Sequence, residues 1–421
     1  MKDRNENRPG YKKTKVGWIP KEWETTRLGE AANVLFSNVD KKIKENEIKV
    51  LLCNYTDVYN SEYITSDIEF MQSTASSREI VKYRLRYGDV IITKDSETKD
   101  DIAVSALVNE ELTNVVCGYH LAIIRPLQKN LLSGEYLNKL FDAKIMRHYF
   151  AKLANGVTRF GLTSKAVNNA LIPSPPFPEQ KKIAEILSTW DEAIEQTRKL
   201  IETKRRRQKA LMQQLLTGKK QFKDKGGNNW RIRLLGELIE PVSRPVSKPK
   251  QPYLSIGIRS HGKGTFQKIV KQPEKVMMET LYRLDAQDIV LNITFAWEGA
   301  IAIATERDKG GLVSHRFPTY RFREKEADID FFRSLFLTKR FVWDLGLISP
   351  GGAGRNRVMN QKDFLKLKVY VPTIDQQREL GRILASADNE LRLYNDYLRA
   401  LEQQKRGLMQ KLLTGEIRVK T

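Results

Sequence analysis

The sequence contains one long segment twice, and this duplication restricts the possible folds more than any other feature. Residues 211–218 read LMQQLLTG and residues 408–415 read LMQKLLTG. Without a gap, the same offset of 197 residues also superposes Gln180 on Gln377 and Asp191 on Asp388. A match that stays in register over roughly forty residues indicates an internal duplication.

Both copies carry side chains at alternating steps of four and three, a spacing typical of a coiled-coil seam with left-handed supercoiling. In the first copy the seam consists of Ile183, Leu187, Trp190, Ile194, Thr197, Ile201, Lys204, Gln208, Leu211 and Leu215. In the second copy it consists of Leu380, Leu384, Ala387, Leu391, Tyr394, Leu398, Leu401, Lys405, Leu408 and Leu412. We therefore expect the two helices to pair. The alternative is two separate amphipathic helices, each packed on its own domain.

The connections between the segments predict how the helices run. The first helix is followed by a second domain within about a dozen residues, a short connection, and the second helix begins after that domain. The helices should then be antiparallel, with a domain at each end and a pseudo-twofold axis between them. The domain starts also repeat, since Trp23 matches Trp230 at an offset of 207.

The expected fold class is α/β (mixed α+β), because strand-like and helix-like runs alternate in both domains. It comprises two globular domains separated by two long antiparallel coiled-coil helices. The predicted segments are a flexible basic tail, the first domain, the first helix, the second domain and the second helix, at residues 1–16, 17–177, 178–218, 219–373 and 374–416.

The charge balance indicates a polyanionic partner. Lys and Arg number 73 against 51 Asp and Glu, which gives a net charge of +22. A charge this positive favours nucleic acid, although a solvated basic surface or an acidic protein partner is also compatible with it. Only two cysteines are present, and there is no long apolar run. We therefore expect a cytoplasmic protein without structural disulfides or a membrane span. The four scattered histidines predict no metal site.

The candidates for DNA contact are basic residues, most of them in stretches interleaved with aromatic residues or in glycine-containing loops, because arginine binds both guanine edges and phosphates. In the first domain these candidates are Arg78, Arg84, Arg86, Lys94, His120 and Arg159. In the second domain they are Arg259, His261, Lys263, Arg283, Arg316, Arg321, Arg355 and Arg357. For any single candidate, a solvated surface position is an equally good interpretation.

Three short motifs imitate enzyme signatures. Gly257–Lys263 fits the first positions of a phosphate-binding P-loop, but no Ser or Thr follows and the next residues are extended rather than helical. Ser174–Phe177 resembles the Ser-Pro-Pro-aromatic motif of amino-methyltransferases without its cofactor loop. Asp89, Glu97 and Lys99 resemble a nuclease triad. We predict no catalytic, cofactor-binding or metal-binding residue, and a metal-dependent nuclease remains the enzymatic alternative.

Several longer stretches resemble one family. They are GWIPKEW at 17–23, GDVI at 88–91, PPFPEQKKIAEILSTWDEAIE at 175–195, WEG at 297–299, DQQRELGRILASAD at 375–388 and the two LLTG endings. In these stretches the chain resembles the specificity (S) subunit of Type I restriction-modification systems, over essentially its whole length after the tail. The second repeat departs mildly, with Thr373–Gln377 in place of a Pro-x-x-Glu-Gln sequence.

The resemblance implies a function without catalysis in this chain. Two target-recognition domains would each read one half of a bipartite sequence in double-stranded DNA. The helices would set the spacer and dock two methyltransferase (M) subunits, with endonuclease/translocase (R) subunits joining the complex. S-adenosylmethionine and ATP would be bound by those partners and no cofactor by this chain. Because the two domains differ in sequence, the target would be asymmetric. A coiled-coil adaptor indifferent to DNA sequence is the third hypothesis.

Overall fold

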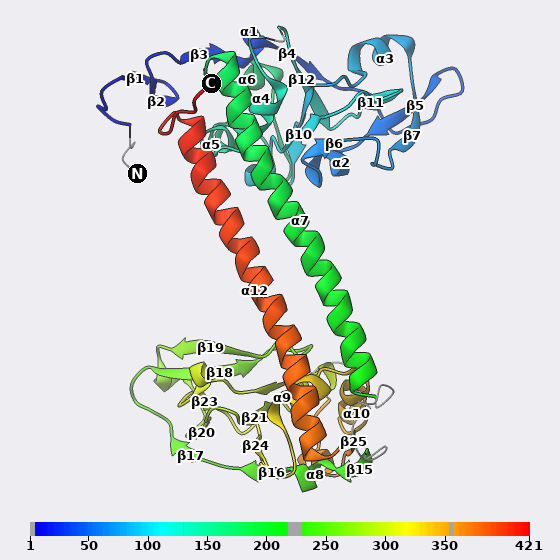
Figure 1. The fold of residues 1–421 in the computed structure, drawn as a ribbon, viewed down its shortest axis with the longest axis vertical. Coiled ribbons are helices and arrows are strands. Elements are labelled where there is room, and N and C mark those ends of the chain that lie inside the picture. Colours follow the sequence, from blue (N-terminus) through cyan, green and yellow to red (C-terminus); the bar gives the residue numbers. More distant parts are fainter. Residues whose placement is uncertain (1–4, 129, 218–229, 353–356) are drawn as a thin grey trace. The chain divides into compact units, whose positions relative to one another are not determined.

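The computed structural model describes residues 5–128, 130–217, 230–352 and 357–421. The chain divides into two compact units, of which unit 1 comprises Met1–Thr197 with Tyr397–Thr421 and unit 2 comprises Arg198–Asp396. Each unit contains a mixed domain of strands and helices together with one half of each long helix, α7 (Phe177–Leu215) and α12 (Ile374–Leu413) (Figure 1). The predicted fold class is confirmed.

The domain of unit 1 is built on a five-stranded sheet whose middle strands are buried on both faces. Its strand order is β4 (Ala32–Phe36), β12 (Leu121–Pro126), β8 (Val90–Thr93), β10 (Ser105–Val108) and β6 (Tyr63–Ile64). A smaller sheet contains β11 (Val115–Cys117), β5 (Ile48–Cys53) and β7 (Met71–Ala75). The helices are α1 (Leu28–Ala31), α2 (Tyr55–Tyr59), α3 (Ser77–Tyr83), α4 (Gly134–Phe141), α5 (Lys144–Leu153) and α6 (Ser164–Asn168).

The domain of unit 2 repeats the main sheet in the same order. Its strands are β16 (Ile239–Val242), β24 (Thr319–Phe322), β21 (Ile289–Leu291) and β22 (Ile301–Ile303), equivalent to β4, β12, β8 and β10. The second sheet contains β17 (Pro245–Ser247), β20 (Thr280–Arg283), β23 (Leu312–Val313), β18 (Tyr253–Ile258) and β19 (Thr265–Val270). The helices are α8 (Leu235–Leu238), α9 (Ile329–Leu335), α10 (Lys339–Leu347) and α11 (Gln361–Leu365).

A strand from the start of each domain pairs with the strand that leads into its long helix. In unit 1, β3 (Glu24–Arg27) pairs with β14 (Leu171–Ser174), and in unit 2, β15 (Arg231–Leu234) pairs with β25 (Lys368–Val371). Both pairs are antiparallel. The matching sequence at the two domain starts therefore corresponds to a matching structural role.

The predicted pairing of the two long helices is confirmed, because α7 and α12 contact each other within both units. All twenty seam positions are buried or half-buried, and none is exposed. In unit 2, Lys204 pairs with Glu390 and Gln208 pairs with Asp388, so α7 and α12 run antiparallel there. Because the helices contact each other through these side chains, the alternative of two helices that pack only on their own domains is wrong.

Two buried glutamines show that the duplication extends to individual contacts. Gln180 accepts a hydrogen bond from Ser133 N–H (2.9 Å) and donates to the carbonyls of Leu131 and Pro175 (both 2.9 Å). Its counterpart accepts from Asp328 N–H (3.1 Å) and donates to the carbonyls of Glu326 and Pro372 (3.3 and 3.0 Å). The equivalent bonds lock the first turn of each long helix to its own domain.

Replacing Gln180 by leucine should lower the free energy of unfolding of unit 1 by about 2–3 kcal/mol, because two buried backbone groups and one partly buried group would lose their partner. Gln196→Leu is the matched control, since Gln196 lies on the same helix and is exposed. Hydrogen exchange of α4 peptides in the full-length chain measures the loss. Equal effects of the two substitutions would contradict the role given to Gln180.

The N-terminal segment differs from the expectation. Residues 1–16 were expected to form a flexible tail, but Tyr11–Thr14 form β1, which pairs with β2 (Gly17–Pro20). The Tyr11 hydroxyl donates to the Gly415 carbonyl (2.6 Å), and Arg8 donates to the Glu416 carbonyl (2.9 Å). The polar composition of this segment predicted disorder. Instead, two of its polar side chains donate to carbonyls just beyond the end of α12, where no further helical N–H groups are available as partners.

Candidate nucleic-acid interface

In unit 1 the fold brings together three candidates that are far apart in the sequence. Lys94 follows β8, His120 precedes β12, and Arg159 lies in the loop before α6. The Lys94 N–H donates to the His120 carbonyl (3.0 Å), and the Leu162 N–H donates to the Lys94 carbonyl (2.8 Å). These backbone bonds hold the three segments side by side.

Asp95 organises the charges of this cluster. Its carboxylate accepts a hydrogen bond from Arg159 Nη2 (2.7 Å) and lies 3.0 Å from His120 Nδ1. Two short strands, β9 (Asp95–Ser96) and β13 (Phe160–Gly161), pair beside it. The ion pair with Asp95 therefore holds Arg159 in place, while more than half of the Arg159 side chain, 57%, stays exposed.

Lys94 is held more deeply than Arg159. Its ammonium donates to the Ser37 carbonyl (2.8 Å) and lies 4.5 Å from the centre of the Tyr119 ring. Burial lowers the pKa of Lys94, and the nearby Asp95 carboxylate opposes that shift. Tyr119 is half exposed, at 51%. The outer groups of the cluster are thus an aromatic ring and a guanidinium, which can stack on bases and bind phosphate or base edges.

Unit 2 assembles the equivalent three segments in the same way. The Ile293 N–H donates to the Arg316 carbonyl (3.1 Å), and the Met359 N–H donates to the Ile293 carbonyl (2.9 Å). These bonds correspond to those around Lys94 in unit 1, so Arg316 takes the place of His120. The segment before α11 provides Arg357 close to the position that Arg159 has before α6.

The side chains of this second cluster differ from those of the first. The Arg357 guanidinium lies 5.0 Å from the centre of the Trp297 ring and donates to the Gly346 carbonyl (2.8 Å). Arg316 Nη1 lies 3.3 Å from Thr294 Oγ1. Thr294 stands at the position of Asp95, and the Glu298 carboxylate in this loop accepts a hydrogen bond from Ser260 Oγ (2.7 Å) rather than from an arginine. The same framework therefore presents different chemistry in the two units.

The glycine-rich segment Gly257–Lys263 joins the second cluster. Its first two residues end β18, and the rest lies in the turn that leads to β19, with His261 at a positive φ of 62°. The N–H groups of His261 and Gly262 donate to the carbonyls of Glu298 and Gly299 (2.8 and 3.0 Å). Since a strand rather than a helix follows, the P-loop interpretation is excluded. His261 and Lys263 are exposed at the turn.

The remaining candidates lie outside the two clusters. Arg84 and Arg86 line a separate cleft of about 500 Å³ near the end of α3, and Arg78 is exposed near the start of that helix. Arg259 stacks over the Phe266 ring (5.1 Å), and Arg283 is exposed at the end of β20. Arg355 lies outside the described residues. The contact of each candidate with DNA stays a prediction.

Arg321 makes an ion pair within the protein that the sequence pattern did not reveal. Its Nε donates to the fully buried Asp288 (3.2 Å). At the equivalent place in unit 1, Arg125 donates to Asp89 through Nε and Nη2 (both 2.7 Å). Sequence reasoning missed Arg125. The signal was the aspartate that repeats in the two domains as Asp89 and Asp288, which is followed in each domain by one of these two arginines.

Asp89 does not have the environment of a nuclease carboxylate. It is 1% exposed, and both oxygens are occupied by Arg125 and the Arg86 N–H. Burial raises the pKa of Asp89, and Arg125 opposes that shift. Within the described residues, no three His, Cys, Asp or Glu side chains are placed to hold a metal ion.

Among the helices of the described residues, none combines the length and the apolar character that a membrane span needs.

Residues 20–204 match the family model described as the Type I restriction modification DNA specificity domain, and two curated specificity subunits align with nearly the whole chain. The chain is similar to the specificity subunits of Type I restriction enzymes over nearly its whole length. The relatives are the MjaX and MjaVIII type I restriction enzyme specificity subunits of Methanocaldococcus jannaschii. They are 26% and 23% identical, cover 98% and 96% of this chain, and are themselves covered over 97% and 94% of their lengths.

Solved structures support the fold of this chain. The crystal structure of a Type I restriction-modification S subunit from M. genitalium covers 93% of this chain and 96% of its own, with a TM-score of 0.55 and 15% identity. A chain from a structural study of complex assembly and conformational transition of the type I system covers 95% and 99%, with a TM-score of 0.54 and 15% identity. The matched family model is a DNA specificity domain, so the two clusters are candidate surfaces for DNA contact.

Proposed function

We propose that each unit of this specificity subunit reads one half of a bipartite, asymmetric sequence in double-stranded DNA. The observation that carries the proposal is the repeated framework. Equivalent backbone bonds join the same three segments around Lys94 and around Ile293, while the exposed side chains differ. A shared framework with different side chains is what two readers of different half-sites require.

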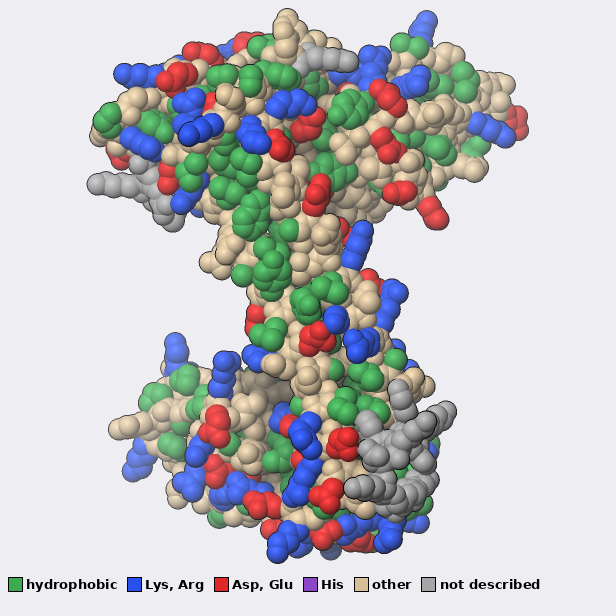
Figure 2. Space-filling model, in the orientation of Figure 1, with side chains coloured by type: hydrophobic (Ala, Val, Ile, Leu, Met, Phe, Trp, Pro, Cys, Tyr) green, Lys and Arg blue, Asp and Glu red, His purple; other side chains and the backbone are tan. Residues whose placement is uncertain are grey.

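The long helices are proposed to set the unread spacer and to dock two methyltransferase subunits, with endonuclease/translocase subunits joining the full complex. In this proposal S-adenosylmethionine and ATP are bound by those partners, and this chain supplies recognition rather than catalysis. The net charge of +22 supports a role on DNA, because neutralising phosphates provides the sequence-independent part of the affinity. Figure 2 shows Lys and Arg side chains on the visible face of both domains, interspersed with Asp and Glu.

Arg159→Ala and Arg316→Ala should each relax recognition in one half-site only. Loss of a base contact costs about 1–3 kcal/mol, roughly a tenfold to hundredfold change at that base. Methylation-sensitive long-read sequencing of cells carrying each variant, with the cognate methyltransferase subunit, reports both half-sites at once. Arg392→Ala, an exposed arginine on α12, is the control.

Each rival hypothesis predicts a different result. If both half-sites relax together in each variant, two independent readers are ruled out. If deleting the gene leaves the methylome unchanged while the methyltransferase subunit is present and active, the adaptor hypothesis is favoured. If the purified chain alone cleaves DNA with magnesium and Glu97→Ala abolishes cleavage, the chain is a nuclease.

A further inference from the structure

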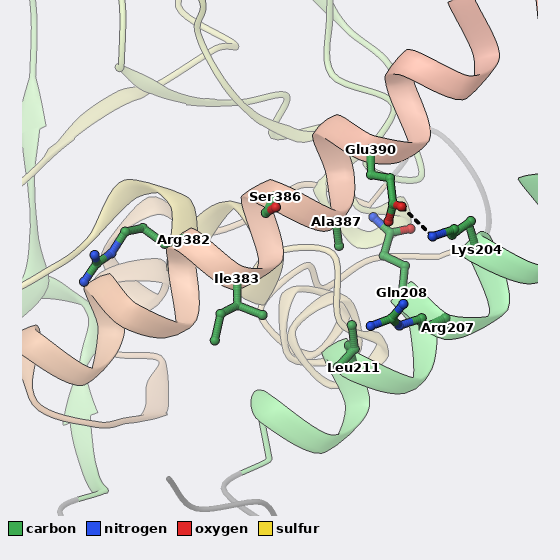
Figure 3. Close-up of a pocket in the computed structure, with 9 residues that line it drawn as sticks. All are labelled: Lys204, Arg207, Gln208, Leu211, Arg382, Ile383, Ser386, Ala387 and Glu390. Carbon is green, nitrogen blue, oxygen red and sulfur yellow. Dashed lines mark hydrogen bonds and ion pairs between the residues drawn. The ribbon is translucent and has the colours of Figure 1, made fainter. Parts of the chain in front are cut away.

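Within unit 2, a cleft of about 340 Å³ opens between α7 and α12 (Figure 3). Its apolar wall consists of Leu211, Ile383 and Ala387, and three cations also line it: Lys204, Arg207 and Arg382. The close-up shows Gln208 and Leu211 of α7 facing Ile383 and Ala387 of α12. The cleft thus combines an apolar wall with positive charge.

The duplication explains why space is left at this point of the seam. Ala387 is the counterpart of Trp190 at the offset of 197 residues, and Lys204 is the counterpart of Leu401. Trp190 is half-buried on its own helix in unit 1. Unit 2 therefore has the methyl group of Ala387 where unit 1 has the indole of Trp190, and it has Lys204 where unit 1 has Leu401. The repeat itself indicates that the missing bulk is that of an aromatic ring.

The charges around the cleft are only partly neutralised. Lys204 pairs with Glu390, and its ammonium also lies 5.8 Å from the centre of the Tyr394 ring. Among the residues that the structure describes, Arg207 and Arg382 make no ion pair with a carboxylate. Both are exposed. Arg382 Nε donates to the Arg378 carbonyl (3.3 Å), which leaves its two Nη groups available. Guanidinium groups without a carboxylate partner at the edge of an apolar cleft favour carboxylates, which they bind in a bidentate geometry.

We propose that this cleft docks an acidic segment of the methyltransferase subunit that inserts one aromatic side chain against Ala387. This inference rests on the proposed function, because it assigns that partner to a defined surface. The apolar wall suits an aromatic ring. A DNA phosphate could bind the cations at the edge, but it would have to lose water against Leu211 and Ile383, which offer it no polar contact. Since Trp190 stands at the equivalent position in unit 1, the two methyltransferase subunits dock on non-equivalent surfaces.

The test measures the affinity of the full-length chain for the purified methyltransferase subunit. Ala387→Trp fills the cleft from within and should weaken binding of one of the two copies by about tenfold to hundredfold. Arg207→Glu combined with Arg382→Glu should weaken it similarly without altering the seam, which keeps the test valid if Ala387→Trp misfolds. The controls are Ala400→Trp and Arg205→Glu, exposed positions on the same helices outside the cleft.

The outcomes separate this inference from the proposed function. If the wild-type complex methylates no bipartite sequence, the proposed function itself is wrong. If the wild-type complex methylates such a sequence and both cleft variants bind the methyltransferase subunit with control affinity, the docking inference is overturned. It is also overturned if the charge-reversal variant loses affinity for DNA alone while its affinity for the methyltransferase subunit is unchanged.

Discussion

Asp191→Asn is expected to lower the free energy of unfolding of unit 1 by about 3–5 kcal/mol, the usual effect of removing one partner from a buried ion cluster. Asp191 is 9% exposed and accepts a bond from Lys139 Nζ (2.7 Å) and another from Lys405. Lys139, 3% exposed, also pairs with Glu62. Without the carboxylate, two partly or fully buried ammonium groups face each other, while Lys139 keeps Glu62 and the Tyr63 hydroxyl (3.1 Å) as partners.

The same cluster gives unit 1 a defined dependence on pH. Burial raises the pKa of Asp191, but Lys139 and Lys405 more than offset this, so the pKa lies below its ordinary value of 3.8. A lowered folded-state pKa means that the stabilisation is fully present above the unfolded-state pKa of about 4 and is lost as pH falls through the lower, folded-state value. The difference between wild type and Asp191→Asn should therefore shrink below about pH 4.

Asp388 provides a matched control within the chain. It is the counterpart of Asp191, but it accepts a bond from Gln208 rather than from a lysine. Burial raises the pKa of Asp388, so its charged form costs stability above the ordinary pKa. Asp388→Asn should change stability by no more than about 1 kcal/mol at neutral pH.

Hydrogen exchange measures both variants in one chain, because peptides from α4 report on unit 1 and peptides from α9 report on unit 2. The expected result is faster exchange in α4 for Asp191→Asn and unchanged or slower exchange in α9 for Asp388→Asn. Equal losses in the two units would mean that the lysines around Asp191 contribute little.

The sequence predicts the contacts that depend on local periodicity and on the register of the repeat. The seam from Ile183 to Leu215 follows from steps of three and four, and the shared role of Gln180 and Gln377 follows from one offset. Both depend on neighbours a few residues away or on the duplication itself. The segment before Gly17 could not be predicted in this way, because its order depends on carbonyls some 400 residues later.

The candidate site could be predicted only as a list of residue types. Lys94, His120 and Arg159 are joined by long-range backbone bonds and by Asp95, which no sequence spacing reveals. Sequence reasoning likewise gave Arg321 the same status as Arg316, although only Arg321 pairs with a buried aspartate. A guanidinium that completes an ion pair and one that faces solvent look alike in sequence. The partner decides between them.

Arg125→Ala should be among the most destabilising substitutions in unit 1, by about 3–5 kcal/mol. Arg125 makes both side-chain ion contacts to Asp89, which is 1% exposed and would keep only the Arg86 N–H (2.8 Å). Because the pKa of Asp89 is already raised by burial, loss of the guanidinium raises it further. Protonation then relieves the unpaired charge, so the deficit should be largest above this raised pKa and should decrease as pH falls through it.

Arg321→Ala tests the same ion pair where a second arginine is present. Asp288 also accepts bonds from Arg244 Nη1 and Nη2 (2.6 and 3.2 Å), so the carboxylate stays paired after Arg321 is removed. The expected loss is no more than about 1 kcal/mol, because the side chain of Arg321 is 44% exposed. Exchange rates in α4 and α9 compare the two variants directly. If Arg321→Ala leaves unit 2 stable but relaxes one half-site in the methylome, Arg321 contacts DNA as well as Asp288; if both stability and methylation are unchanged, it is removed from the DNA-contact candidates.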